Sequence, residues 1–193
     1  GMEWLESMGA DIVNVSLGYT TFDPGQDSYT YEDMDGNTAK TTIVSDIAVG
    51  LGVVVVASAG NSGCSNPDNC WYYIGSPADG DSVITAGAVS LAGNRVSFSS
   101  RGPTYDGRIK PDVAALGSSV QVGHPGGGYT LAGGTSFSSP LTAGVACQIL
   151  QANPDLTPID VRTLLRATSS QSSNPDNNLG WGIINAGEAV RLA

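Results

Sequence analysis

The sequence predicts an α/β fold of three layers, in which helices cover both faces of a mostly parallel sheet. Helical and strand-like patterns alternate along the chain, which is typical of such folds. Residues 53–56 are four consecutive valines, and this unbroken run favours a strand that is buried on both faces. The segment that follows residue 136 is small or apolar on nearly every side, so we expect a helix that runs through the core.

The first half of the chain contains clear start and stop signals. We expect a helix over 2–8 that stops at Gly9, and then a strand over 11–17. Residues 19–37 are polar and aromatic, which predicts an insertion or a long loop. A second helix over 39–51 ends at Gly52 and leads into a strand over 53–58.

The second half continues the alternation. Strands are expected over 83–89 and 112–114, and the three glycines at 126–128 predict a hairpin that ends near residue 131. Another helix begins at Thr157, because a capping residue is followed by Pro158 and by an acid in the first turn. Its buried face is marked by Val161, Leu164 and Leu165.

Length and charge narrow the class of protein. The 193 residues, 40% of them hydrophobic, suffice for one sizeable core, so we expect one domain or most of one. A net charge of −10 argues against nucleic acid, and the eight Lys and Arg residues form no cluster along the sequence. No run of 18 apolar residues occurs, so we expect no membrane span.

The three cysteines fall into two kinds. Cys64 and Cys70 flank a polar loop and are either a disulfide pair or two free thiols, and we favour the disulfide. Neither has further ligands nearby, so we expect no metal site. Cys147 lies in the apolar helical segment and is interpreted as a small packing residue.

The most informative stretch is residues 132–140, where glycines lead directly to a hydroxyl at the start of the long helix. Backbone N–H groups that a helix leaves unpaired in its first turn point toward the hydroxyl of Ser136. There they can stabilise an anion that forms on an attacked carbonyl. Gly133 and Gly134 allow a sharp turn and close approach of a substrate. Ser136 is therefore a candidate nucleophile.

This stretch resembles the active-serine motif of the subtilisin-like serine peptidases, the subtilases, in its Gly-Thr-Ser core, Pro140 and residues 143–144. A second, distant match is the strand that ends in Gly60 and Asn61, which resembles the oxyanion-hole loop of that family. Residues 11–18, 83–89, 98–103, 106–113 and 180–185 also match in order, so the resemblance covers nearly the whole chain.

The resemblance implies a role for each matching residue. Ser136 would be the nucleophile and Asn61 the oxyanion donor of a serine endopeptidase. A polypeptide substrate would lie along Ser16, Leu17, Gly18, Gly60, Gly134 and Thr135. The chemistry needs no cofactor. The polar insertion and Phe137-Ser138 are more similar to exported subtilases of the Bacteroidetes type than to small secreted subtilisins, which implies a secreted, cell-surface or periplasmic protein.

The resemblance also implies that two catalytic groups lie elsewhere. Subtilases place their acid and base before the strand that here begins at Asp11. The single histidine, His124, stands in a turn sequence without an acidic partner, and we interpret it as a surface residue. We therefore expect residues 1–193 to be the carboxy-terminal part of a catalytic domain, incomplete at its amino-terminal side and inactive alone. The alternative is a non-catalytic relative with a binding or structural role.

Other features leave alternatives open. Residues 33–37 have the oxygen density of a calcium loop, and subtilases often bind structural calcium, but a solvated acidic turn is favoured. Tyr19, Phe22, Tyr29 and Tyr31 either line a peptide-binding cleft or pack the insertion on the sheet, and residues 71–73 are interpreted as a local aromatic cluster. The strand over 11–17 is expected to present an open edge, which either binds the upstream segment of the same domain or supports self-association.

Overall fold

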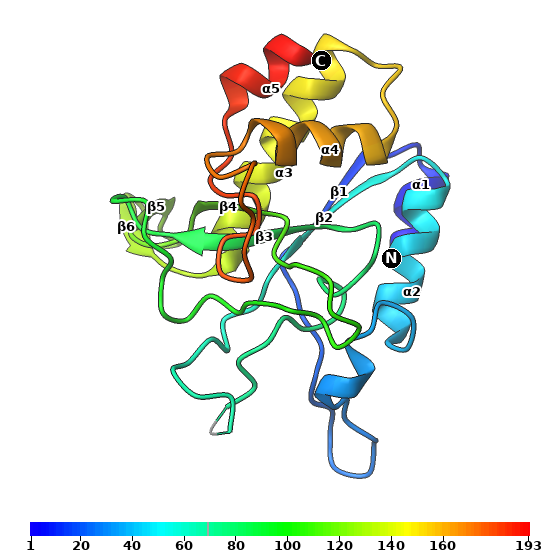
Figure 1. Cartoon of the computed structure of the whole chain (residues 1–193), viewed down its shortest axis with the longest axis vertical. Helices are drawn as coiled ribbons and strands as arrows, with labels where there is room; N and C mark the ends of the chain where they lie inside the picture. The colour runs from blue at the N-terminus through cyan, green and yellow to red at the C-terminus, as the bar shows by residue number, and fades with distance from the viewer. Residues whose placement is uncertain (69) are drawn as a thin grey trace.

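The computed structural model describes residues 1–68 and 70–193, and its centre is a sheet of four strands in the order β1-β2-β3-β4 (Figure 1). All three pairings are parallel. The strands are β1 (Ile12–Val15), β2 (Val54–Ser58), β3 (Ile84–Val89) and β4 (Val113–Leu116). β2 and β3 are buried along their whole length, as the valine run predicts for central strands of a parallel sheet.

Helices cover both faces of this sheet, which confirms the three-layer α/β prediction (Figure 1). On one face Val53 and Val55 pack in a cluster with residues of α1 (Met2–Ser7) and α2 (Lys40–Gly50). On the other face Val54 and Val56 pack beneath α3 (Thr135–Ala152), α4 (Pro158–Thr168) and α5 (Ala186–Leu192). Successive side chains of a strand point to opposite faces, so β2 contributes to both layers of the core.

The remaining elements also follow the local signals. A 3-10 turn, η1 (Tyr31–Asp33), is the only regular element described within the long loop over 19–37. β5 (Val120–Gly123) and β6 (Tyr129–Ala132) form the expected antiparallel hairpin, with Gly127 and Gly128 in the left-handed region at φ of 91° and 76°. Among residues 1–68 and 70–193, no helix is both long and apolar enough to cross a bilayer.

The start of α4 shows how the capping signal works. The Thr157 side chain accepts a hydrogen bond from the Asp160 N–H, while the Asp160 carboxylate accepts one from the Thr157 N–H at 3.0 Å. This reciprocal pair satisfies backbone N–H groups that have no hydrogen-bond acceptor within the helix. Pro158 has no N–H group, and none is needed at the first helical position. The helix then buries Val161 and Leu165 completely.

The prediction that α3 is buried on all sides is wrong. Ala146 and Ile149 are fully buried against the sheet, but Leu141 is 44% exposed, and Gly144 and Cys147 are exposed as well. The last three residues recur every third position and therefore share a face that points away from the sheet. No described residue covers this face, so within residues 1–193 Cys147 is exposed and does not pack in the core as the sequence suggests.

The acidic turn over 33–37 uses its carboxylates to bind its own backbone. Asp35 accepts hydrogen bonds from the N–H groups of Asn37 and Thr38, both at 2.8 Å, and Asp33 accepts one from Thr30 N–H at 2.7 Å. Within the described residues, no group of three or more His, Cys, Asp or Glu side chains is arranged to hold a metal ion. Met34 is fully buried, so the turn is anchored to the core as well as solvated.

Basic residues that are dispersed along the sequence gather in space. Arg108, Lys110, Arg162 and Arg166 line one cavity beneath α4, although the sequence suggests no cluster. They come from two loop positions and from two positions one helical turn apart on α4. The sequence could not reveal this because the pairing of β3 with β4 and the packing of α4 bring the segments together.

Candidate active site

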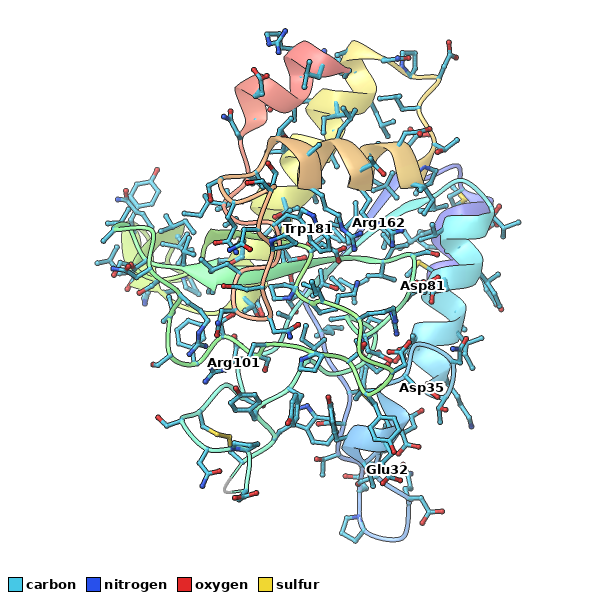
Figure 2. All side chains as sticks on the ribbon, viewed as in Figure 1. Glu32, Asp35, Asp81, Arg101, Arg162 and Trp181 are labelled. Carbon is cyan, nitrogen blue, oxygen red and sulfur yellow. A yellow bond between two sulfur atoms is a disulfide. The ribbon has the colours of Figure 1, made fainter. Side chains whose placement is uncertain are left out.

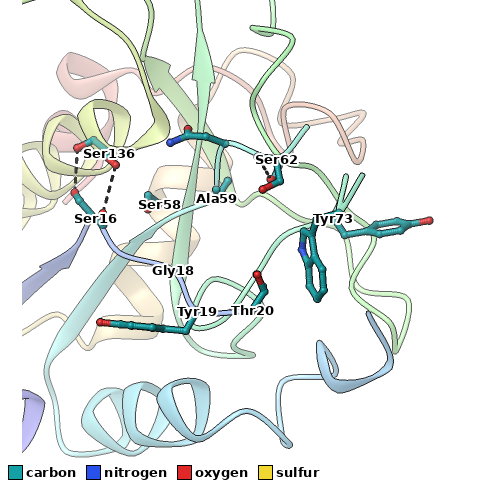
Figure 3. Close-up of a pocket in the computed structure, with 14 residues that line it drawn as sticks. Ser16, Gly18, Tyr19, Thr20, Ser58, Ala59, Ser62, Tyr73 and Ser136 are labelled. Atoms are coloured by element: carbon teal, nitrogen blue, oxygen red, sulfur yellow. Dashed lines mark hydrogen bonds between the residues drawn. The ribbon is translucent and has the colours of Figure 1, made fainter. Parts of the chain in front are cut away.

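Ser136 stands in the first turn of α3, at the carboxyl ends of β1 and β2. Its Oγ donates a hydrogen bond to the Ser16 carbonyl at 3.3 Å, and Ser16 Oγ donates to the Ser136 carbonyl at 3.0 Å (Figure 3). Ser16 directly follows β1, so the two contacts fix the helix start against the end of the sheet. The carboxyl ends of parallel strands are the usual location of a ligand site in α/β folds.

Asn61 follows β2, and Thr135 holds its side chain in place. Asn61 Oδ1 accepts hydrogen bonds from Thr135 N–H at 2.8 Å and from Thr135 Oγ1 at 3.0 Å. Thr135 Oγ1 in turn accepts a hydrogen bond from Gly60 N–H at 3.1 Å. Because the oxygen end of the amide is anchored in this way, its Nδ2 end is presented as a neutral donor.

The two expected oxyanion donors border the same point in space. A Cβ atom built on Gly134 would lie 3.4 Å from Asn61 Nδ2 and 3.7 Å from the Ser136 backbone nitrogen. Gly134 also has φ of 150°, a backbone conformation that L side chains rarely adopt. Glycine at this position therefore leaves open a space that two N–H donors can reach, which is what an oxygen with developing negative charge requires.

Both residues line one cavity of about 210 Å³. Its walls come from the segments 16–20, 58–62 and 71–75, from Ser100 and from the start of α3, and among the described residues they contain no carboxylate, lysine, arginine or histidine (Figure 3). Of the residues expected to bind substrate, Ser16, Gly18 and Gly60 line the cavity, whereas Leu17 is 60% exposed outside it and Thr135 is buried behind it. The residues of the wall are Ser16, Gly18, Tyr19, Thr20, Ser58, Ala59, Gly60, Asn61, Ser62, Trp71, Tyr73, Gly75, Ser100 and Ser136.

Several of these wall residues carry no signal in the sequence. Thr20 and Gly75 meet because Tyr19 N–H donates to the Ser76 carbonyl at 2.9 Å, which joins two distant loops. A Cβ atom on Gly75 would lie 2.9 Å from Thr20 Cγ2, so a larger residue at position 75 would displace the Thr20 side chain from the cavity wall. Contacts between loops are set by tertiary packing, and residue spacing alone cannot predict them.

The aromatic residues divide between the two interpretations that the sequence leaves open. Tyr19 lines the cavity, whereas Phe22 and Tyr29 contact each other with ring centroids 5.2 Å apart. Tyr31 stacks on Tyr73 at 3.7 Å, and burial together with its neighbours Tyr73, Asp106 and Tyr105 raises the pKa of Tyr31 to about 12.

Residues 71–73 are more than the local cluster that the sequence favours, because Trp71 and Tyr73 form part of the cavity wall. A disulfide joins Cys64 and Cys70, whose Cα atoms lie 6.6 Å apart, immediately before these aromatics. Residue 69 of that loop lies outside the described residues. Arg101 Nη2 donates to the Cys64 carbonyl at 2.7 Å, and its guanidinium lies 4.2 Å from the centre of the Tyr72 ring.

His124 does not line the cavity. It lies in the turn between β5 and β6, where its Nδ1 accepts a hydrogen bond from the Gly126 N–H at 3.0 Å. The His124 side chain therefore stabilises the turn, and it does not face the cavity that Ser136 lines.

Residues 1–182 match the sequence pattern of the subtilase family. The chain belongs to this family. It is 38% identical over 191 residues to subtilisin E of Bacillus subtilis (strain 168) and 39% identical over 191 residues to subtilisin DY of Bacillus licheniformis. The alignments cover 99% of this chain but 44% and 61% of those two proteins, so this subtilase chain spans about half the length of such relatives.

Solved structures agree with the family. The self-cleaved protease domain of PatA superimposes with a TM-score of 0.71 at 28% identity, over 99% of this subtilase chain and 64% of that one. The prenylagaramide maturation protease PagA superimposes with a TM-score of 0.72 at 26% identity. This match covers 98% of this subtilase chain and 64% of PagA.

Proposed function

We propose that the intact protein is a serine endopeptidase that cleaves polypeptides through an acyl-enzyme on Ser136. The observation that supports this most strongly is that Ser136 and Asn61 line one cavity, and that the Asn61 amide and the Ser136 backbone N–H border the space that Gly134 leaves open. Membership of the subtilase family supports serine peptidase chemistry independently of that geometry.

In the proposed reaction Ser136 Oγ attacks the carbonyl carbon of the scissile peptide bond. A histidine from a segment upstream of residue 1 removes the hydroxyl proton, and an upstream aspartate holds that histidine in the correct orientation. Asn61 Nδ2 and Ser136 N–H donate hydrogen bonds to the oxyanion. The histidine then returns the proton to the leaving amine, and water releases the acyl group. All these groups belong to the protein, so the mechanism uses no cofactor.

An extended substrate would lie beside residues 16–18 and pair with their backbone. Ser16 and Gly18 line the cavity, and backbone pairing of this kind supplies affinity without a strict side-chain requirement. The disulfide between Cys64 and Cys70 supports export of the intact protein, because such bonds persist in oxidising compartments.

We further propose that the upstream segment of the same domain covers the open side of the structure. β1 pairs only with β2 among the described strands, and the exposed face of α3 lies beside it. Ile12 and Cys147 line one cavity of about 520 Å³ there. If this proposal is right, residues 1–193 alone will self-associate or retain a bound peptide, and light scattering with intact mass measurement will detect either. A monomer with no peptide would contradict it.

Covalent labelling tests the peptidase proposal directly. The intact protein, treated with a fluorophosphonate that reacts only with activated serines, should carry the label on Ser136 in peptide mass spectra and should cleave a chromogenic peptide. Ser139→Ala is a matched control because Ser139 lies one helical turn from the nucleophile and is fully buried. An intact protein that neither cleaves nor takes the label would instead support the non-catalytic alternative. Ordinary protease rates from residues 1–193 alone would contradict the need for an upstream base.

A further inference from the structure

A second cavity, of about 230 Å³, lies at the opposite end of the sheet from Ser136. It is lined by Arg108, Lys110, Arg162 and Arg166 together with Asp81 and Trp181. Figure 2 labels Asp81, Arg162 and Trp181. The chain has only eight Lys and Arg residues and a net charge of −10, so half of its basic side chains line this one site. A concentration of positive charge in an acidic protein calls for a physical reason.

Two of the four cations are already paired inside the protein. Lys110 Nζ, which is fully buried, donates to Asp112 Oδ2 at 2.8 Å, to Thr85 Oγ1 at 3.0 Å and to the Val83 carbonyl at 2.8 Å. Arg166 donates from Nε to Asp112 Oδ1 at 2.8 Å, and its guanidinium stacks 4.0 Å from the centre of the Trp181 ring. Through these contacts Lys110 and Arg166 form one side of the cavity, between the amino ends of β3 and β4 and the helix α4.

The other two cations keep donors without acceptors. Six buried side-chain nitrogen or oxygen atoms of the described residues lack a hydrogen-bond partner, and three of these are Nη1 and Nη2 of Arg108 and Nε of Arg162. Arg108 Nε is bound to Asp106 at 2.7 Å, but the nearest oxygen that pairs with Nη1 is Asp81 Oδ1, at 3.9 Å. Arg162 Nη1 donates to the Asp81 backbone carbonyl, and no carboxylate of the described chain pairs with Arg162.

Arg162 is the cation of this site that forms no ion pair among the described residues. The other three cations each pair with a carboxylate of Asp81, Asp106 or Asp112, and the buried carboxylate of Asp79 also acts on Arg108 and Lys110. Buried polar groups are almost always hydrogen-bonded, and an exception needs an explanation, such as strain, a water molecule or an ion at the site. Guanidinium groups present planar forks of donors that fit the oxygens of phosphate or carboxylate.

We propose that this cavity is a binding site for a small oxyanion, held between Arg108 and Arg162 against the wall formed by Arg166 and Trp181. Arg108 Nη1 and Arg162 Nε, which lack hydrogen-bond partners within the protein, are the donors that would bind the oxygens, and the negative charge pairs with Arg162. The cavity lies where β3 and β4 begin, whereas Ser136 lies where β1 and β2 end, so this site is separate from the proposed peptidase chemistry.

Calorimetric titration of the intact protein tests the site. The protein carries Ser136→Ala so that proteolysis cannot interfere, and inorganic phosphate is titrated against sodium chloride at constant ionic strength. We expect saturable binding of one phosphate per chain. Arg162→Gln, and as a second variant Arg108→Gln, should weaken it at least about tenfold, because each removes a charged donor. Arg191→Gln is the matched control: it removes the same charge from an exposed ion pair on α5.

A second titration with acetate distinguishes the possible sources of the oxyanion. Tighter phosphate binding would indicate a free or phosphoryl anion, and tighter acetate binding would indicate a peptide carboxylate; either result supports the site if Arg162→Gln weakens it. The proposal is overturned if neither anion binds saturably, or if Arg191→Gln weakens binding as much as Arg162→Gln. Neither readout uses peptide cleavage, so failure here leaves the peptidase proposal untouched.

Discussion

The two ends of the sheet differ in charge: the cavity at one end is uncharged, whereas the other end contains buried ion pairs. At the carboxyl ends of β1 and β2 the cavity beside Ser136 is lined by hydroxyls, aromatic rings, backbone and one amide, and no charged side chain of the described residues lines it. At the amino ends of β3 and β4 Lys110 and Asp112 are fully buried and form a 2.8 Å ion pair. The neutral donors at the first end can stabilise negative charge that develops only during a reaction. The second end contains side chains that are charged in the folded protein at all times.

This difference explains the type of donor at each end. A neutral amide such as Asn61 stabilises an oxyanion without perturbing the ionisation of its neighbours. A buried carboxylate such as Asp112 needs full positive charges, because an unpaired ion in the protein interior is costly. We therefore expect substitutions at the first end to change the reaction rate and substitutions at the second end to change stability.

The largest effect should come from the nucleophile. Ser136→Ala in the intact protein should lower kcat by about 10⁶, the loss known for the equivalent change in a subtilisin, while the melting temperature stays nearly constant. Chromogenic peptide assays and calorimetry measure the two quantities. A large fall in the melting temperature of Ser136→Ala would contradict the expectation that substitutions at this end change the reaction rate and not the stability.

The second largest effect should come from the buried carboxylate. Asp112→Asn leaves Lys110 and Arg166 without their counter-ion, and it should reduce the free energy of unfolding by about 3–5 kcal/mol. Urea unfolding of the protein that also carries Ser136→Ala measures this. Glu188→Gln is the control, because it breaks an exposed pair with Arg191 and should change stability little. Equal losses in the two variants would contradict the account.

The oxyanion donor should have a smaller effect, and only on the reaction. Asn61→Ala should lower kcat by about 10²–10³ with little change in KM, a range measured on a subtilisin for this kind of donor. Asn94→Ala, which changes an exposed asparagine in the turn after β3, should match the unmodified protein. A rise in KM with unchanged kcat would show instead that Asn61 binds the ground state.

The smallest effect concerns acid pH. Burial alone would raise the pKa of Asp112, but the charges of Lys110 and Arg166 and the hydrogen bonds outweigh it and lower the pKa from 3.8 to about 2. Asp112 therefore contributes stability that is present above pH 3.8 and is lost as the pH falls through about 2. Burial raises the pKa of Asp79 against hydrogen bonds from Thr42 and Gly36, so its contribution has the opposite sign and declines as pH rises.

Urea unfolding at a series of pH values distinguishes these two carboxylates. Asp112→Asn should flatten the loss of stability at the acid end, whereas Asp79→Asn should remove a loss that occurs above pH 3.8. The same pH profile in both variants would show that the two sites do not differ as described.

The same contrast sets the limit of sequence-based prediction. Ser136 and Asn61 could be identified because each lies in a contiguous stretch, where glycines, a strand end and a helix start are adjacent in the chain. The valine run of β2 and the capping box of α4 could be predicted for the same reason: their signals are local. Fold class and most element boundaries follow from such signals.

The cationic cavity could not be predicted, because Arg108 and Arg162 are 54 positions apart in the numbering (162 − 108) and meet only through tertiary packing. The exposed face of α3 escaped prediction for a related reason. An apolar helix of small residues indicates burial, but it does not say whether the covering segment lies within residues 1–193. Wall residues such as Thr20 and Gly75 likewise depend on contacts between loops.

A crystal structure of the intact protein with a peptide boronic acid bound to Ser136 will show whether Asn61 and Ser136 N bind the same oxygen. We expect one boronate oxygen to lie within hydrogen-bond distance of both Asn61 Nδ2 and Ser136 N, in the space that Gly134 leaves open. A boronate whose oxygens all point away from Asn61, with the amide bound elsewhere, would contradict it.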